Sequence, residues 1–87
     1  MEDAHRIPIE DSLDLHPFQP REIPSVVQEY LRAAHQAGHR AVRLIHGRGT
    51  GIQRGIVQSV LEKEPLVESF RDAPDSHLGA TVAVLKP

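Results

Sequence analysis

The sequence predicts an α/β domain, a two-layer sandwich in which two helices cover one face of a four-stranded mixed sheet. Segments with strand patterning alternate with segments of helical apolar spacing in the order β-α-β-α-β-β. Two successive strand-helix-strand units favour parallel pairing with right-handed crossovers, and a short last turn makes the fourth strand antiparallel to the third. The chain has 87 residues, too few to cover both faces generously, so we expect the second face to be partly open.

The first strand and the first helix follow from the spacing of apolar residues. Residues 12–16 (SLDLH) alternate polar and apolar side chains, which is typical of a strand. Over residues 23–34 apolar side chains recur at spacings of three and four, which predicts a helix. Pro24 suits the first turn of that helix, and Gly38 provides its stop.

The second half of the chain contains the other four elements of the predicted order. Residues 40–46 (RAVRLIH) predict a strand, and residues 52–64 predict a helix that Pro65 ends. Residues 66–73 predict a third strand. Residues 80–85 (ATVAVL) are apolar almost throughout, so we expect this strand to lie inside the sheet rather than at its edge.

Composition is that of an ordinary globular domain, with 39% hydrophobic and 25% charged residues. Residues 1–10 predict a flexible leader, and residues 11–87 predict a single domain. The chain has no apolar run near the ~20 residues of a membrane span and no secretory pattern, so we expect a cytoplasmic protein without a membrane partner. The absence of cysteine excludes disulfides and thiolate chemistry.

Charge is distributed unevenly along the chain, although the formal net charge is only -2. Residues 30–61 contain no Asp or Glu but include five arginines and three histidines. A middle section of this kind can present one positive face, which is typical of a protein that binds a polyanion. Chance clustering of solvated arginines is the alternative.

A glycine-rich loop, HGRGTG at residues 46–51, follows the second predicted strand. Its glycines permit positive φ and close approach of a ligand, and amides at the start of the following helix favour an anion. The loop lacks the Gly-Lys-Ser/Thr of a P-loop, and the chain is too small for the usual dinucleotide-binding fold, so we expect no nucleotide cofactor. Arg48 and Arg54 instead predict contacts with the backbone phosphates of a long polyanion.

Two histidines are predicted to meet at one edge of the sheet. His16 ends the first strand and His46 ends the second, and parallel strands would place both at the carboxyl edge, where open α/β sheets bind ligands. Imidazoles exchange protons near neutral pH, and Asp14, two residues before His16, could orient it. The alternative is that Asp14 caps backbone amides and that both histidines are packing residues.

Three segments together resemble the Smr (small MutS-related) domain family: LDLH at 13–16, IHGRGTG at 45–51 and GATVAVL at 79–85. The resemblance implies a fold like the C-terminal domain of a bacterial translation initiation factor. It also implies nucleic-acid binding and, in several members, nicking or ribonuclease activity. The functional positions that it implies are Asp14, His16, His46, Gly47 and Gly49, with Arg48 where many members have Lys.

The sequence departs from the family pattern at two places. Pro17 follows His16, where the commonest motif has glycine. The turn before the last strand retains only Gly79 of the family's GG-x-GAT pattern. These departures concern the activity more than the fold.

These observations lead to one main hypothesis, a low-specificity endonuclease (phosphodiester hydrolase) that nicks or cleaves DNA or RNA and is associated with DNA repair. Its predicted catalytic residues are Asp14, His16 and His46. Its predicted phosphate-binding residues are Gly47, Arg48, Gly49, Thr50, Gly51, Arg54 and Arg43. No dedicated metal site or certain cofactor is predicted, although a divalent ion (Mg²⁺ or Mn²⁺) held with the help of Asp14 is left open.

Two other hypotheses remain open on the sequence alone. One is a binding module without chemistry, which guides a repair or ribosome-associated partner to DNA or RNA. The other is a small interaction domain whose glycine loop is only a turn. The three hypotheses differ in whether the chain cleaves nucleic acid, binds it or ignores it.

Overall fold

Four strands form one mixed sheet in the order β1-β2-β4-β3 in the computed structural model, which describes residues 9–75 and 77–87. β1 (Ser12–Asp14) pairs parallel with β2 (Ala41–Ile45), which pairs antiparallel with β4 (Ala80–Leu85). β4 also pairs antiparallel with β3 (Val67–Asp72), so it lies inside the sheet. The predicted element order, the mixed sheet and the internal position of the last strand are confirmed.

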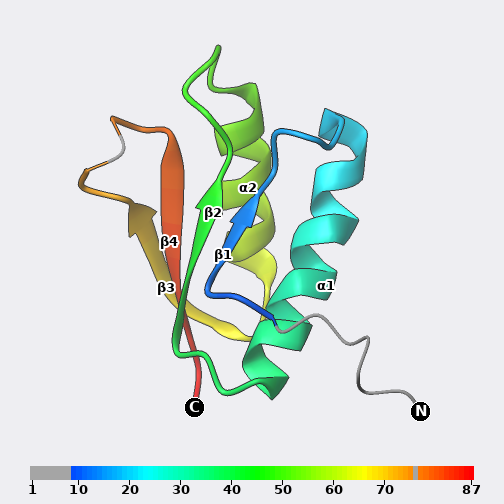
Figure 1. Cartoon of the computed structure of the whole chain (residues 1–87), viewed down its shortest axis with the longest axis vertical. Helices are drawn as coiled ribbons and strands as arrows, with labels where there is room; N and C mark the ends of the chain where they lie inside the picture. Colours follow the sequence, from blue (N-terminus) through cyan, green and yellow to red (C-terminus); the bar gives the residue numbers. More distant parts are fainter. Residues whose placement is uncertain (1–8, 76) are drawn as a thin grey trace.

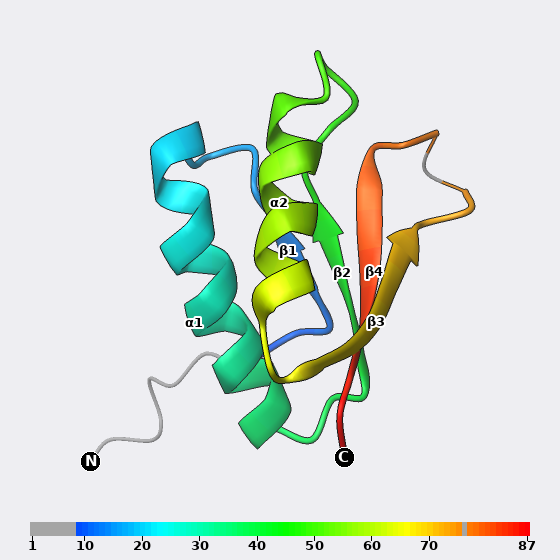
Figure 2. The same ribbon diagram turned by 180° about the vertical axis from the view of Figure 1, so that it is seen from behind.

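Both long helices cover the same face of the sheet, α1 (Ile23–Gln36) beside α2 (Ile52–Lys63), as Figures 1 and 2 show from opposite sides. A short 3-10 turn, η2 (Pro20–Glu22), leads into α1. α1 ends before Gly38, whose φ of +92° is costly for other residues. The predicted helix bounds therefore differ from the observed ones by a few residues at most.

The core lies between the helices and the sheet. The apolar stripe of α1 is buried at Ile23, Val27, Leu31 and Ala34, and α2 contributes Val57 and Leu61. The sheet contributes alternate residues of its inner strands, because successive side chains of a strand point to opposite faces. In β2 and β4 these are Val42, Leu44, Ala83 and Leu85.

The first strand is shorter than the predicted 12–16. It ends at Asp14, and the amide of Phe18 donates to the carbonyl of Leu15 at 3.1 Å, which closes a turn over His16 and Pro17. Proline has no amide hydrogen and so cannot extend a ladder of hydrogen bonds. His16 therefore belongs to a turn at the edge of the sheet rather than to the strand.

The predicted leader lies outside the described residues as far as Pro8. In the described part, the carbonyl of Ile9 accepts from Nε2 of His39 at 2.8 Å, and that of Glu10 accepts from the Tyr30 hydroxyl at 2.5 Å. Within the described ranges, none of the helices has the length and apolar character needed to cross a membrane.

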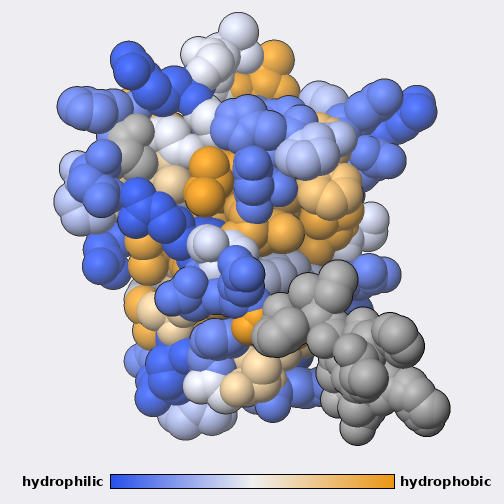
Figure 3. Space-filling model, in the orientation of Figure 1, coloured by the Kyte–Doolittle hydropathy of each residue, from blue (hydrophilic) through white to orange (hydrophobic). Residues whose placement is uncertain are grey.

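The second face of the sheet carries no helix in the part of the chain that the structure describes (Figure 1). Strand register places Arg43 of β2 beside Val82 of β4, and Val82 beside Arg71 of β3, all on this face. Figure 3 views it and shows apolar surface broken and bordered by hydrophilic side chains. We call this surface the open face.

Candidate active site at the carboxyl edge of the sheet

A pocket of about 390 Å³ lies where β1 and β2 end. Because the two strands are parallel, the residues that follow them emerge at the same edge. The pocket is lined by residues 46–53 together with His16 and Pro20. The structure thus brings together both predicted histidines and the whole glycine loop.

His16, which lines this pocket, forms a hydrogen-bonded pair with Asp14. Oδ1 of Asp14 lies 2.6 Å from Nδ1 of His16 and also accepts the His16 backbone amide at 3.0 Å. The backbone amide, followed by the ring, lowers the pKa of Asp14 below its ordinary 3.8. A carboxylate can only accept, so Nδ1 of His16 carries the hydrogen, and in the neutral ring Nε2 keeps a free lone pair.

Nε2 of His16 faces the backbone of the glycine loop. A Cβ added to Gly47 would stand 2.9 Å from this nitrogen, and Gly47 has a φ of +83°. Only glycine satisfies both conditions without strain. The sequence motif therefore has a direct physical reason: Gly47 lets the basic nitrogen of His16 approach the loop.

His46 reaches the same pocket but is almost completely buried, at 3% exposure. Its Nδ1 lies 3.0 Å from the carbonyl oxygen of Gly47, and its Nε2 lies 2.9 Å from the hydroxyl oxygen of Thr81. The carbonyl can only accept, so Nδ1 donates to it, and the neutral ring accepts the Thr81 hydroxyl hydrogen at Nε2. Both ring nitrogens of His46 are engaged inside the protein.

A polar chain continues from Thr81 beneath helix α2. The side-chain amide of Gln58 donates to the hydroxyl of Thr81 and to Oδ1 of Asp72, each at 3.1 Å. Arg54 donates to both carboxylate oxygens of Asp72, at 2.7 and 2.8 Å, and this bond is the largest cause of the lowered pKa of Asp72. The chain connects α2, β3 and β4 to His46 and so to the loop.

The backbone also holds the loop in place. The carbonyl of Gly79, immediately before β4, accepts from the amides of His46 at 3.1 Å and Gly47 at 2.9 Å. The loop thus has a fixed base, whereas its tip at Arg48, Gly49 and Thr50 is exposed. Figure 1 shows this loop and the turn before β4 at the same end of the sheet.

The predicted arginines separate into three environments. Arg48 lines the pocket and makes no ion pair with another described residue. Arg54 is held by Asp72, and Arg43 lies on the open face, where it contacts Asp75 at 2.7 Å. Of the three arginines, the structure brings only Arg48 to the pocket.

The side chains around the pocket do not form a ready metal site. Within residues 9–75 and 77–87 no three His, Cys, Asp or Glu side chains converge as metal ligands would. The described residues that line the pocket include no carboxylate, and the Asp14 carboxylate behind His16 already accepts two hydrogen bonds from it at Oδ1. Divalent magnesium and manganese prefer several oxygen ligands, so the donor set fits such an ion poorly.

Sequence reasoning missed the residues that support the site. Thr81 is the single polar residue of the apolar segment ATVAVL, and this was a usable signal, because a buried hydroxyl needs a partner. Gln58 lies four positions after Arg54, on the same side of a helix, but nothing in the sequence links either residue to Asp72. Pro20 and Gln53, which line the pocket, gave no signal.

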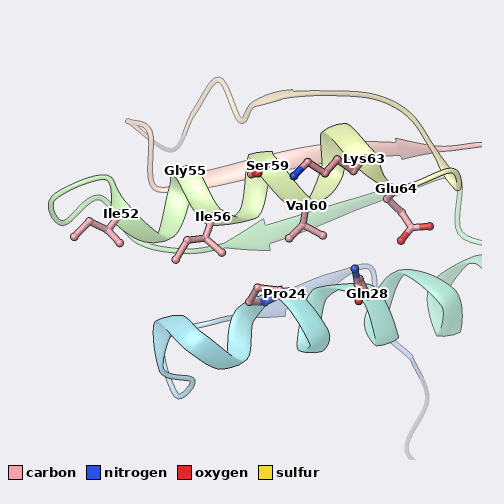
Figure 4. Close-up of a pocket in the computed structure, with 9 residues that line it drawn as sticks. All are labelled: Pro24, Gln28, Ile52, Gly55, Ile56, Ser59, Val60, Lys63 and Glu64. Atoms are coloured by element: carbon pink, nitrogen blue, oxygen red, sulfur yellow. The ribbon is translucent and has the colours of Figure 1, made fainter.

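A larger hollow contains none of these polar groups. The groove between α1 and α2 has a volume of about 580 Å³ (Figure 4). Its walls are largely aliphatic, from Ile52, Ile56 and Val60 of α2 and Pro24 of α1, and its charged residues are Lys63 and Glu64. The groove has no histidine and no pair of groups suited to proton transfer, so the smaller pocket is the candidate active site.

The fold and the edge site define a class of two-layer α/β domains with a histidine and glycine-loop pocket at the carboxyl edge of the sheet, and comparison with known proteins identifies the family. The Smr domain family matches residues 13–86. This chain belongs to the Smr domain family.

The relatives include endonuclease MutS2 of Clostridium perfringens, 35% identical over 80 residues, and that of Thermus thermophilus, 36% identical over 77 residues. These alignments cover 90% and 86% of this chain but only 10% of each relative. The chain thus spans about a tenth of the curated relatives it matches and is homologous to their Smr domains.

Solved structures agree with this assignment. The Smr domain of Thermus thermophilus MutS2 superposes with a TM-score of 0.84 at 35% identity, covering 90% of this chain and 100% of that domain. YdaL, a stand-alone small MutS-related protein of Escherichia coli, gives 0.82 at 26% identity, covering 97% of this chain and 70% of YdaL. The fold class predicted from the sequence is therefore confirmed.

Proposed function

We propose that this Smr domain binds nucleic acid and cleaves phosphodiester bonds in the pocket between His16 and the glycine loop. The observation that carries the proposal is the oriented imidazole. Asp14 holds Nδ1 of His16 at 2.6 Å, which leaves Nε2 as a basic nitrogen directed at the loop. The endonuclease name of the MutS2 relatives supports the same reaction class.

In this reaction His16 is the general base. Its Nε2 takes the proton from an attacking water, or from a ribose 2′-hydroxyl when the substrate is RNA, while the oxygen attacks phosphorus. Asp14 stabilises the imidazolium that forms and keeps the ring in place. The leaving oxygen takes its proton from solvent or from the His16 imidazolium.

The phosphate is bound by the loop next to His16. Arg48 supplies a guanidinium that forms no ion pair with the other residues the structure describes. The first amides of α2 follow Gly51, an N-cap residue that has no side chain to occupy them. Donors fixed before the reaction stabilise the charge that develops on the phosphate without reorganisation. The exposed Thr50 hydroxyl adds one more donor at the pocket.

His46 is a positioning residue in this proposal rather than a second proton carrier. Its ring is buried and both nitrogens are engaged, so it has no free nitrogen to offer the substrate. It fixes the carbonyl of Gly47 and thereby the path of the loop beneath His16. The sequence predicted His46 as a catalytic residue, and in this proposal it positions the loop instead.

One observation favours a second candidate, a nucleic-acid-binding module without chemistry. The pocket offers a single imidazole with a free nitrogen, whereas cleavage is faster when an acid and a base act together. Such a module would use Arg48 and the loop amides to bind phosphate and would recruit a partner. Both candidates predict binding that weakens as salt rises, because phosphate neutralisation releases counterions.

Cleavage assays distinguish the two candidates. Purified chain is incubated with supercoiled plasmid and, in parallel, with a single-stranded RNA, in Mg²⁺, in Mn²⁺ and in chelator. We expect nicked circles or shortened RNA, a loss of about 10²- to 10⁴-fold in His16→Ala, and no change in His35→Ala, a control histidine on α1. Wild type that binds both substrates but cuts neither under any condition would establish the binding module instead.

A further inference from the structure

The open face of the sheet has a second pocket that adjoins the first. It has a volume of about 320 Å³ and is lined by Arg43, Ile45, Gly47, Arg48, Gly79 and Ala80. Gly47 and Arg48 line both pockets, so the glycine loop is the wall between them. A strand of nucleic acid bound at His16 would reach this second pocket by crossing the loop.

The chemistry of the second pocket suits a nucleotide. Ile45 gives it apolar surface on which a base can pack, and Arg43 and Arg48 place guanidinium groups beside that surface. Guanidinium groups pair with phosphate and stack on planar rings, which makes arginine the usual residue for nucleic-acid contacts. An apolar surface between two cations complements a base joined to its phosphate.

Arg43 forms an ion pair with the carboxylate of Asp75, an anion that a phosphate of nucleic acid could replace. Its guanidinium donates to Asp75, in the turn after β3, at a distance of 2.7 Å. The Asp75 side chain is 76% exposed and that of Arg43 is 37% exposed. Ion pairs between exposed groups contribute little stability, so an incoming phosphate can replace Asp75 at small cost.

The turn that carries Asp75 is held in an unusual conformation. His77 and Leu78 both have positive φ, +52° and +69°, although neither is glycine. Non-glycine residues in this region are uncommon and concentrate where backbone conformation matters for function. The turn leads directly into Gly79 and Ala80 of the second pocket.

We propose that the second pocket binds the nucleotide next to the cleaved phosphate, and that Asp75 is an internal competitor for its phosphate on Arg43. This subsite rests on the proposed function, because it extends the path of the same nucleic-acid strand. The base packs on Ile45, the neighbouring phosphate takes the place of the Asp75 carboxylate on Arg43, and Arg48 contacts the strand between the two pockets. Asp75 thereby weakens the binding of nucleic acid without contacting the reaction centre.

Binding to a fluorescent single-stranded 12-mer, made once as DNA and once as RNA, tests the subsite by anisotropy. All variants carry His16→Ala so that the probe stays intact. We expect Arg43→Ala to raise the Kd about tenfold, as loss of one charged hydrogen-bonded contact does, and to lower the salt slope by about 0.7. Asp75→Asn should lower the Kd several-fold, because it removes the competitor.

The double variant Arg43→Ala/Asp75→Asn is the decisive member of the set. If Asp75 acts only through Arg43, the double variant binds like Arg43→Ala alone. Arg32→Ala, which removes one exposed positive charge from α1, is the matched control and should bind like the parent. Thermal melts of every variant verify that the fold is intact.

Three results would overturn the subsite. These are unchanged binding by both single variants, an effect of Asp75→Asn that persists without Arg43, and displacement of the 12-mer by polyglutamate as well as by unlabelled 12-mer. The last would make the second pocket a general anion site. If the wild type cleaves but any of these three results is found, the proposed function stands and the subsite is wrong. If the wild type does not cleave but the variants bind as expected, the cleavage is wrong and the subsite stands.

Discussion

Replacing Gly47 by alanine tests the contact on which the proposed reaction depends. The added methyl carbon would stand 2.9 Å from Nε2 of His16, and a residue with a side chain would have to keep a φ of +83°. The substitution therefore has two separate effects. One is backbone strain, and the other is displacement of the imidazole from the loop.

The two effects differ in size and in what they change. A non-glycine residue in the left-handed region costs about 1–2 kcal/mol, which lowers the Tm of a domain of this size by roughly 4–16 °C. Carbon and nitrogen atoms pack at about 3.5 Å or more, so the ring must move by roughly 0.5–1 Å. His16 is exposed and can move at little cost in stability, but a 1 Å displacement of a reacting group can cost about 100-fold in rate.

Gly38→Ala separates strain from displacement. Gly38 has a similar φ of +92°, nothing lies within 4 Å of its added Cβ, and it follows α1, at the opposite end of the sheet from the pocket. We expect both variants to lose similar thermal stability. Only Gly47→Ala should lose cleavage, by about two orders of magnitude, measured as initial rates of plasmid nicking or RNA cleavage well below either Tm.

Two outcomes would refute this reasoning. If both variants cleave as fast as wild type after correction for folded fraction, His16 does not act from its position over Gly47. Equal loss in both would show that general destabilisation, rather than the position of the imidazole, controls the rate.

Three further predictions concern the surroundings of the pocket. His46→Ala should lower stability by about 1–3 kcal/mol in urea melts, because the Thr81 hydroxyl hydrogen loses its acceptor and the loop carbonyl loses its donor. A variant as stable as wild type would contradict the buried network. The lowered pKa of Asp72 means that its contribution to stability is complete above pH 3.8 and is lost as pH falls through the lowered value, so Asp72→Asn should flatten stability against pH below about 4. Leu78→Gly should raise the Tm by a few degrees, because the strain at φ +69° exceeds the entropic cost of glycine, and a lower Tm would refute strain at this turn.

The fold could be predicted from the sequence because its signals are local. The apolar stripe of the first helix, the strand alternation and the stop at Gly38 each depend on residues a few positions apart. The crossover rule then leaves few ways to join the elements, and the observed order β1-β2-β4-β3 is one of them. The first strand was predicted too long, because the alternation continues to His16 while the hydrogen-bonding pattern does not.

The sequence was enough to locate the candidate site, but not to assign the role of each of its residues. The carboxyl edge of two parallel strands follows from topology, so the meeting of His16, His46 and the loop was predictable. What each imidazole does depends on partners from distant segments. Thr81, which engages His46, is 35 positions away, and no spacing rule links the two.

The ion-pair partners of the arginines could not be predicted from the sequence either. A section without acidic residues predicted a single positive surface, but Arg43 and Arg54 are paired with Asp75 and Asp72 from the later part of the chain. Sequence separation of charges does not imply separation in space. Arg48 pairs with no carboxylate of the described residues, because it lies at the exposed tip of a loop.

The contrast between the two histidines explains how a small domain can combine a buried support with an exposed reactive group. His46 is buried and fixes the loop through Gly47, whereas His16 is exposed and held by one carboxylate. The fixed base of the loop keeps its amides and Arg48 in position while the phosphate of the substrate binds. His16 lies over this loop at a distance that Gly47 permits, so the glycine beneath it matters more to the rate than to the stability of the fold.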